Sequence, residues 1–494
     1  MIELIDHLES LEENGELVSI EEEVDWNLQV AAIAAMANRT GAQAIHFKKI
    51  KGYPEKYTLA ANLLSGPGHH YSYKRTLWGR MAIAMGLDPK IDYEKFIKTY
   101  NDRFENPIMP VKLTEGDCQE VVEADDDVDL YKFPFPYLHK EDGGRYGFGT
   151  LILKDPDSSW QNWGVYRFMI ADHNTIVADF LTEPGLSRDT REIYRKQCSL
   201  KTPMPFAIAI GGPPALTIAG ASGARGVSEA EIAGGLNLDP INLVKAEKSD
   251  LLVPADAEMI IEGEISPHEM IEEGPYGSIR GYSERSLRPV MKVTAITHKD
   301  KLIIPVIVDG TKVSDTQAII SMTESARLMR MGRKAGMLLR WIQIPPEWNL
   351  SIGIAAVNNP IHGITFRIAR YLFAITNLFD KLILVDADVF PSQLVTVIGD
   401  WAHKSNPIDK THLLDGYPPA VMPYYRDVVD DPLKGSARMY IDACWPPHWG
   451  PDEKPAPISF EHSFSKELQE SVLRRWKEEF KIPVEPFVLP ENQR

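Results

Sequence analysis

The middle of the chain contains several short apolar stretches that are separated by turns. The predicted strand segments are Thr150–Leu153, Ala207–Ile210, Ala215–Ala219, Leu243–Lys245 and Ile260–Ile261. An acidic run, Glu123–Asp129, and the proline-punctuated Phe133–Pro136 mark a boundary ahead of them. This density of short strands favours a barrel-like β domain over a doubly wound sheet.

The region before this boundary alternates helical and strand patterns. Leu4, Leu8 and Leu11 recur at helical spacing, and Glu16–Ile20 has the character of a strand. A helix rich in alanine and isoleucine is predicted at residues 28–38. This order of elements is typical of an α/β domain.

After about residue 309 the sequence again alternates between helices and apolar strands. Helices are predicted at 323–339 and 366–373, and strands at 352–357 and 381–385. The pattern resembles a βαβ unit and indicates a further α/β domain. We therefore predict an α/β domain over residues 1–115, a β-barrel domain over 116–309, and an α/β domain with an extended tail over 310–494.

Composition and charge exclude several classes of protein. The 494 residues include 53 basic and 70 acidic side chains, so the formal net charge is −17. A surface this acidic repels phosphate backbones, so nucleic-acid binding is not expected. The three cysteines form no CxxC pair, which argues against a disulfide scaffold or a thiolate zinc site. No apolar run is long enough to cross a bilayer and the N-terminus lacks a signal-peptide pattern, so we expect a cytoplasmic protein.

One turn, Glu272–Tyr282, concentrates residues that can carry chemistry. It contains two carboxylates, three glycines, a proline, two tyrosines and an arginine. Glycine and proline at these positions predict a tight turn whose backbone can approach another group closely. Taken alone, such a turn is more often a solvated surface loop than a site.

Two further stretches could bind an anion. Asn162–Arg167 follows a predicted strand and ends in an arginine, whose planar fork suits a carboxylate or a phosphate. Ala219–Glu229 is rich in glycine and small residues, so its backbone N–H groups could surround an anion. Taken in isolation, the first stretch is more often a surface ion pair and the second an ordinary loop. No dinucleotide fingerprint, P-loop, HExxH or GxSxG motif is present.

Taken in chain order, these and other stretches resemble the UbiD-like family of reversible decarboxylases, which use prenylated FMN. Asn162–Arg167, for example, matches the family pattern N-x-G-x-Y-R, and the likeness spans nearly the whole chain. The order of the motifs carries the resemblance more than any one of them. The matching stretches are Gly15–Ile20 with Val24–Asp25, Phe47–Pro54, Leu138–Gly144, Asn162–Arg167, Gly226–Ala230, Leu251–Ala255, Glu258, Glu262–Gly263, Glu273–Gly277, Ala295–His298 and Val385–Val389.

The resemblance implies a fold and a reaction. The fold class would be α/β and β, with an N-terminal α/β unit, a central split β-barrel that holds the flavin, and a C-terminal α/β domain for oligomerisation. The reaction would be a non-oxidative, reversible decarboxylation of an aromatic or α,β-unsaturated carboxylic acid, free or as a CoA thioester. Prenylated FMN would act as the electron sink. A separate flavin prenyltransferase would supply it, and the enzyme would form homodimers or homohexamers.

The resemblance also implies roles for individual residues. Arg167 and Glu273 correspond to the catalytic pair beside the cofactor. Asn162 and Glu229 correspond to ligands of a divalent metal, Mn²⁺ or Mg²⁺, that bridges the flavin phosphate, with K⁺ nearby. The residues predicted to bind the cofactor are Asn162, Trp163, Gly164, Val165, Tyr166, Arg167, Ser222 and Glu229.

The chain departs from the family pattern at two positions. Ser278 stands where the family has the glutamate that usually donates the proton, and a hydroxyl is a far poorer acid than a carboxyl group. Glu273, water or another side chain such as Glu284 would have to supply the proton. Residues 187–189 (Ser, Arg, Asp) occupy the approximate place of the family's metal-binding histidine. These losses leave open a rival interpretation, a cofactor-poor structural subunit of a multi-subunit aryl carboxylase.

Overall fold

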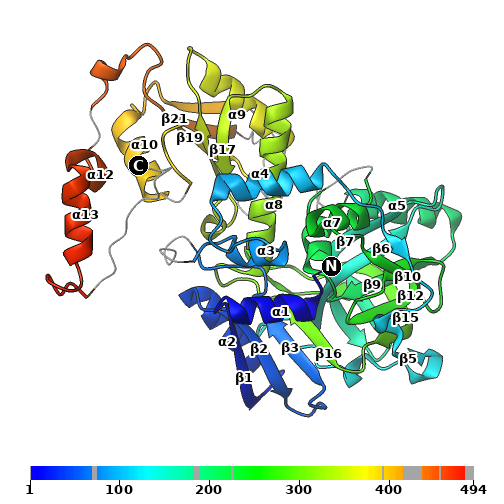
Figure 1. Ribbon diagram of the computed structural model, residues 1–494. Helices are drawn as coiled ribbons and strands as arrows, with labels where there is room; N and C mark the ends of the chain where they lie inside the picture. The colour runs from blue at the N-terminus through cyan, green and yellow to red at the C-terminus, as the bar shows by residue number, and fades with distance from the viewer. Residues whose placement is uncertain are drawn as a thin grey trace.

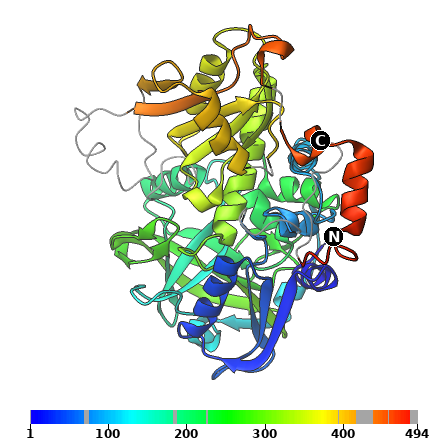
Figure 2. The ribbon, with the colours of Figure 1, turned by 90° about the vertical axis from the view of Figure 1, so that its left-hand side faces the viewer.

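The computed structural model describes residues 2–68, 75–181, 188–223, 227–391, 394–415, 437–455 and 458–483. An N-terminal sheet lies beside a β-barrel, and a C-terminal α/β domain stacks above both (Figure 1). The long helix α8 (Asp315–Lys334) runs from the lower layer into the C-terminal domain, as the side view also shows (Figure 2). The fold therefore combines α/β and β parts, as predicted.

The N-terminal sheet has the strand order β1-β2-β3-β16. Leu4, Leu8 and Leu11 are all buried, so their helical spacing does mark the core-facing side of α1. Strand β16 comes from far along the chain, beyond the barrel, and pairs in parallel with β3. The elements are α1 (Leu4–Glu13), β1 (Leu17–Val24), α2 (Gln29–Thr40), β2 (Ala44–Ile50), β3 (Tyr57–Ala61), α3 (Gly79–Ala84), α4 (Tyr93–Phe104) and β16 (Leu302–Val306).

Six strands close the barrel within the described part of the chain. They run in the order β12-β9-β6-β7-β8-β15, and β15 pairs back with β12. The barrel strands are β6 (Arg145–Lys154), β7 (Gln161–Asp172), β8 (Thr175–Ala178), β9 (Met204–Ile210), β12 (Met259–Glu273) and β15 (Ser286–His298). The accompanying elements are β4 (Val111–Lys112), β5 (Val121–Ala124), α5 (Arg188–Leu200), α6 (Pro214–Gly220), α7 (Glu229–Asn237), β10 (Asn242–Lys245), β11 (Leu252–Pro254), β13 (Gly277–Ser278) and β14 (Gly281–Tyr282).

The C-terminal domain is built on a sheet with the order β17-β18-β19-β21-β20, in which β18, β19 and β21 are parallel. Its elements are β17 (Leu339–Gln343), β18 (Ile352–Val357), α9 (Ile364–Ile375), β19 (Lys381–Asp386), α10 (Leu394–Lys404), β20 (Thr411–Asp415) and β21 (Ala437–Ala443), with α12 (Phe460–Ser463) and α13 (Lys466–Arg475) following. Among the described residues, no helix has both the length and the apolar character that crossing a membrane requires.

One predicted strand, Ala215–Ala219, is wrong. These residues form helix α6, which begins at Pro214. Proline at the first helical position fixes a helical φ and lacks only an N–H that would have no partner there. Ala215, Leu216, Ile218 and Ala219 are buried, a spacing of one, three and four residues that suits a helix. The run is too short for its period to be read reliably from sequence.

Candidate active site

The register between β6 and β7 determines which predicted cofactor residues lie together. Trp163, Val165 and Arg167 alternate with Asn162, Gly164 and Tyr166 along β7, so the two sets point to opposite faces. Across the strand pair, Thr150 lies opposite Val165 and Phe148 opposite Arg167. The predicted cofactor stretch is therefore divided between two faces of one strand.

Arg167 and Glu273 meet in the structure. The guanidinium Nε lies 3.1 Å from Glu273 Oε1 and Nη2 lies 3.4 Å from Oε2. Nη2 also donates to Asp179 Oδ2 at 3.0 Å. Burial alone would lower the pKa of Arg167, but the charges of Glu273 and Asp179 outweigh burial and raise it. Among the described residues, none accepts a hydrogen bond from the remaining nitrogen, Nη1, so this donor is available to a ligand.

Two tyrosines hold the ion pair in place. The hydroxyl of Tyr146 on β6 donates to Glu273 Oε1 at 3.1 Å. The guanidinium of Arg167 stacks over the ring of Tyr276 at 4.6 Å from the ring centroid. Sequence reasoning assigned no role to these tyrosines or to Asp179. Tyr276 lies in the turn singled out above and Tyr146 two residues after the stretch Leu138–Gly144, whereas Asp179 lies in no recognisable motif.

The glycine-rich turn brings Glu273 to this position. Gly274 has φ +95°, a conformation that strongly favours glycine. The carboxylate of Asp142 accepts the N–H of Gly277 at 2.8 Å, and the N–H of Gly143 donates to the carbonyl of Pro275 at 2.8 Å. The turn is therefore pinned by the loop that precedes β6, and the simple interpretation as a free surface loop does not hold.

Ser278 is not placed to donate a proton, as expected of a hydroxyl, and Glu284 is poorly suited to that role. The hydroxyl of Ser278 donates to the carbonyl of Gly281 at 2.7 Å, so its proton is already bound. Glu284 is exposed. Neither geometry supports direct donation from these side chains to a buried substrate.

Asn162 and Glu229 both lie near the start of β7. Glu229 Oε2 accepts the N–H of Trp163 at 3.1 Å, and Asn162 Nδ2 donates to Thr190 Oγ1 at 2.8 Å. Burial raises the pKa of Glu229 to about 7, and the charge of Asp189 acts in the same direction. Residues 182–187, which include Ser187, lie outside the described residues, whereas Asp189 and Thr190 on α5 are described and were not predicted as site residues.

Ser222 follows the end of α6, close to β7. Its hydroxyl is buried and has no hydrogen-bond partner among the described residues. A Cβ placed on the neighbouring Gly220 would lie 3.1 Å from Val165 Cγ2, so α6 packs tightly onto the strand here. Within the described part of the chain, the hydroxyl of Ser222 is therefore a buried polar group that forms no hydrogen bond.

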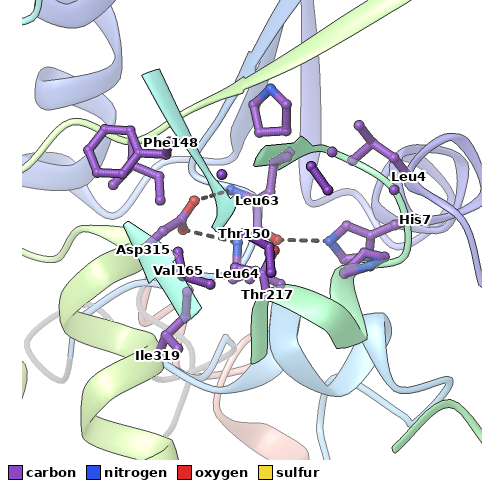
Figure 3. A pocket seen from close by; sticks show the side chains of 17 residues that line it. Leu4, His7, Leu63, Leu64, Phe148, Thr150, Val165, Thr217, Asp315 and Ile319 are labelled. Carbon is purple, nitrogen blue, oxygen red and sulfur yellow. Dashed lines mark hydrogen bonds between the residues drawn. The ribbon is translucent and has the colours of Figure 1, made fainter. Parts of the chain in front are cut away.

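A cavity of about 60 Å³ lies on the face of β7 that carries Arg167. Phe148, Thr150 and Val165 form its barrel side, and Ile319 on α8 closes another side (Figure 3). Asp315 at the start of α8 also lines it, and accepts the N–H groups of residues 63–65 at 2.6–3.0 Å. The cavity is therefore bounded by both the barrel and the connection to the C-terminal domain.

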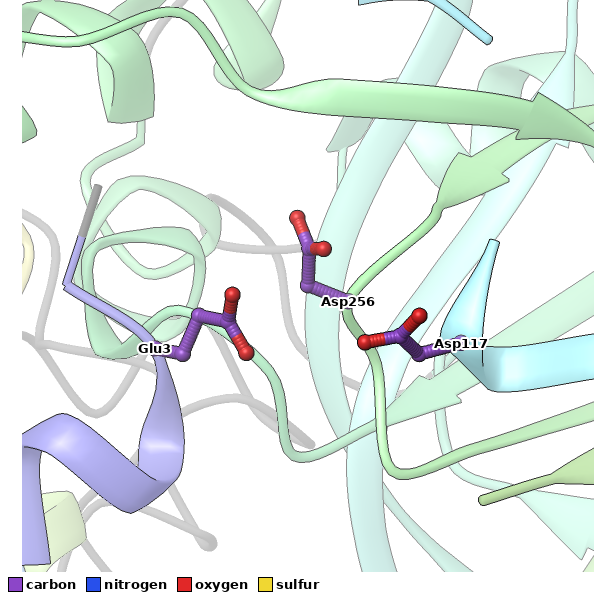
Figure 4. Close-up of side chains that lie close together, drawn as sticks. All are labelled: Glu3, Asp117 and Asp256. Atoms are coloured by element: carbon purple, nitrogen blue, oxygen red, sulfur yellow. The ribbon is translucent and has the colours of Figure 1, made fainter. Parts of the chain in front are cut away.

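A separate carboxylate group, Glu3, Asp117 and Asp256, joins α1 to two barrel loops (Figure 4). Lys299 Nζ lies 3.6 Å from Glu3 and interacts electrostatically with both aspartates. None of the predicted site residues belongs to this group.

Comparison with known proteins places the chain in a family. Two family models match it: the 3-octaprenyl-4-hydroxybenzoate carboxy-lyase N-terminal domain over residues 8–99 and the Rift-related domain of the same name over residues 110–312. Pyrrole-2-carboxylic acid decarboxylase of Pseudomonas aeruginosa is 31% identical over 491 residues, which cover 96% of this chain and 97% of that protein. Ferulic acid decarboxylase 1 of Saccharomyces cerevisiae is 30% identical over 345 residues, covering 68% of each.

The fold agrees with the sequence comparison. The UbiD-class enzyme HmfF from Pelotomaculum thermopropionicum in complex with FMN superimposes with a TM-score of 0.81 at 26% identity, covering 92% of this chain and 97% of that one. The open form of vanillic acid decarboxylase from Sedimentibacter hydroxybenzoicus gives a TM-score of 0.80 at 24% identity, covering 97% and 99%. The chain therefore belongs to the UbiD family and is a carboxy-lyase.

Proposed function

We propose that this enzyme reversibly decarboxylates an aromatic or α,β-unsaturated carboxylic acid with prenylated FMN as its cofactor. The observation that carries the proposal is the Arg167–Glu273 pair on the face of β7 that borders the cavity, in which Arg167 Nη1 has no acceptor among the described residues. Relatives named for pyrrole-2-carboxylic acid and ferulic acid support this substrate class.

The residues present fit a flavin. The cavity, Val165 and Arg167 lie on one face of β7, and the unpartnered hydroxyl of Ser222 lies close to the same strand. A ring system against this face would meet the walls made by Thr150 and Ile319, and Arg167 is the strand partner of Phe148, another residue of the cavity wall. When bound, prenylated FMN supplies an electron sink for the carbanion that loss of CO2 would otherwise leave unstabilised.

The protein side chains would orient the substrate acid and supply the proton that replaces CO2. Arg167 Nη1 would bind the carboxylate of the substrate, and the buried walls of the cavity would exclude water from the carbon that loses CO2. A proton must then replace CO2, and Glu273 is the carboxylate that lies at the pair. Its carboxylate accepts hydrogen bonds from Arg167 and from the hydroxyl of Tyr146, which hold it in place.

We propose that a divalent metal, Mn²⁺ or Mg²⁺, binds near the start of β7. Asn162 and Glu229 supply an amide oxygen and a carboxylate there, which are ligands that hard cations prefer. Asp189, whose charge acts on Glu229, adds a further carboxylate where the family histidine is missing. A cation at this position would relieve the cost of ionising the buried Glu229, and K⁺ could bind nearby.

The remaining parts of the proposal concern partners and substrate form. A flavin prenyltransferase would supply the cofactor, and the C-terminal domain would support a homodimer or homohexamer. The acid would be free or a CoA thioester. A structural-subunit role is less well supported, because a chain without catalysis would have no need of a buried arginine that keeps an open donor.

The test begins with the cofactor. The chain would be co-expressed with a flavin prenyltransferase, and the absorbance of the purified protein and the mass of the released cofactor measured. We expect prenylated flavin, CO2 release from a panel that includes pyrrole-2-carboxylate and cinnamic-type acids, and solvent deuterium at the former carboxyl carbon. Complete absence of prenylated flavin would refute the proposal, and bound cofactor without turnover of any acid would favour the structural role.

A further inference from the structure

The imidazole of His139 lies against the turn that carries Glu273. A Cβ placed on Gly277 would lie 2.4 Å from His139 Nδ1, so the ring touches the backbone of the turn. The ring also meets Tyr276 and Tyr282 edge to face, with centroids 6.0 and 6.2 Å away. The His139 side chain is 19% exposed. Any change in this ring therefore acts directly on the position of the turn.

Both ring nitrogens of His139 face acceptors. Nε2 lies 3.0 Å from the backbone carbonyl of Asp309, which can only accept, so Nε2 carries a hydrogen. Nδ1 lies 3.2 Å from Asp142 Oδ2. The two oxygens of Asp142 already accept the N–H groups of His139 and Gly277, at 2.9 and 2.8 Å, so Nδ1 faces an oxygen that acts as an acceptor. With both nitrogens donating, the ring is an imidazolium.

The electrostatic surroundings of His139 agree with this protonation. Burial alone would lower the pKa of His139, but the hydrogen bond and charge of Asp142, aided by Asp309, outweigh burial and raise it. The titratable groups that face the ring are Asp142 from its own loop, Asp309 from the segment before α8, and Tyr276 and Tyr282 from the turn. Burial raises the pKa of Tyr276 well above 10, so this phenol stays neutral throughout the relevant range.

His139 also connects the turn to the wall of the cavity. The side chain of Asp309 accepts from the hydroxyl of Tyr276 at 3.0 Å and from Ser314 Oγ at 2.7 Å. Ser314 caps α8, and the next residue, Asp315, lines the cavity. The imidazolium therefore joins three segments: the loop before β6, the turn, and the start of α8.

We propose that His139, as an imidazolium held between Asp142 and Asp309, is a positioning residue of the decarboxylation that fixes the turn bearing Glu273 against α8. The proposal rests on the function proposed above. Because the pKa is raised, the contacts are complete below the ordinary histidine value of about 6.5. They are lost as pH rises through the raised value. The turnover number, rather than KM, therefore falls on the alkaline side.

The chain offers a matched control for this histidine. His173 also pairs with an aspartate, Nδ1 to Asp129 Oδ1 at 2.8 Å, but its side chain is 70% exposed. His173 contacts residues 129–131, which lie outside the turn that bears Glu273. In co-expressed holoenzyme we expect His139→Gln to lower kcat about tenfold at neutral pH, because small displacements of reacting groups are costly. The alkaline fall should vanish in this variant and persist in His173→Gln, with KM nearly unchanged in both. An unaltered alkaline fall in His139→Gln would overturn the proposal.

A second measurement does not depend on turnover. Histidine labelled with ¹³C at Cε1 gives one NMR resonance per residue, and the resonance lost in His139→Gln should titrate above pH 6.5 in the wild-type chain. Asp142→Asn keeps an acceptor for Gly277 while removing the charge, and should shift that titration to lower pH. A His139 ring that is neutral at pH 6.5 would overturn the proposal even if the enzyme is active. Loss of the proposed function would instead appear as missing prenylated flavin, with the NMR titration still deciding the protonation of His139.

Discussion

Two glutamate–arginine pairs in the described part of the chain each have a buried carboxylate, yet their arginines differ in their other contacts. In the N-terminal domain, Glu16 pairs with Arg80 at 2.9 Å and with Arg75. At the barrel, Glu273 pairs with Arg167 at 3.1 Å. The carboxylates are 9% and 1% exposed, so burial of the acid does not distinguish the two pairs.

The difference lies in the donors of the arginines. Arg80 is 2% exposed, and beyond Glu16 it donates to the carbonyls of Ala42, Asn62 and Ser65. Arg167 is 20% exposed, is shared with Asp179, and keeps Nη1 without an acceptor among the described residues. A fully satisfied arginine ties backbone segments together, whereas an incompletely satisfied one beside a cavity can bind a ligand.

The largest effect is expected from Glu273→Gln. Loss of the carboxylate removes the group proposed to handle the proton, so kcat should fall about a thousandfold with flavin still bound. Activity and flavin absorbance of the purified holoenzyme would be measured together. Glu262→Gln is the control, since Glu262 lies on the same strand but accepts from the N–H groups of residues 247 and 248. Near-normal activity of Glu273→Gln would show that Glu273 does not handle the proton.

Glu16→Gln should instead lower stability. The substitution leaves Arg80 buried without its counter-charge, and the free energy of unfolding should fall by about 3–5 kcal/mol. Denaturant unfolding followed by fluorescence would measure this, with activity compared per folded molecule. Removal of the exposed pair partner Asp102 by Asp102→Asn should cost less than about 1 kcal/mol. Equal losses from the two variants would contradict a structural role for the N-terminal pair.

Substitution of each arginine by lysine should also distinguish the two pairs, because one variant should lose activity and the other stability. Arg167→Lys keeps the charge but loses the fork and the stacking on Tyr276, so kcat/KM should fall about a hundredfold. Arg80→Lys should reduce the unfolding midpoint while the folded fraction keeps its activity. If both variants lost activity to the same extent at a temperature where both are folded, the distinction would fail.

The smallest effect is expected from Asp179→Asn. Asp179 accepts from Arg167 at 3.0 Å and from Arg288 at 2.7 Å, so it orients Arg167 without touching Glu273 in any recorded contact. Loss of its charge should lower kcat about fivefold, on the scale of a coupling energy near 1 kcal/mol. A double substitution with Glu273→Gln should add almost nothing, and an additive loss in that double variant would show that Asp179 acts independently of the pair.

Much of the secondary structure follows from local patterns. The leucines of α1, the strand at β19 and the helix α9 were all indicated by periodicity, since each element has a clear apolar face or an apolar run. Helix α6 was predicted as a strand because a run of five mostly apolar residues is too short to show a reliable period. The site was indicated through motifs in chain order, which could not specify the tyrosines and the aspartate that complete it.

The sequence by itself determined the family, the α/β and barrel character of the fold, and the presence of Arg167 and Glu273, because these depend on motif order and local period. Only the tertiary structure decided how the residues of β7 divide between its faces, because that depends on the register with β6. It also decided that Asp179, Tyr146 and Tyr276 support the pair, and that Ser278 turns its hydroxyl to a backbone carbonyl. Such contacts join segments that are distant in the chain, and no local pattern records them.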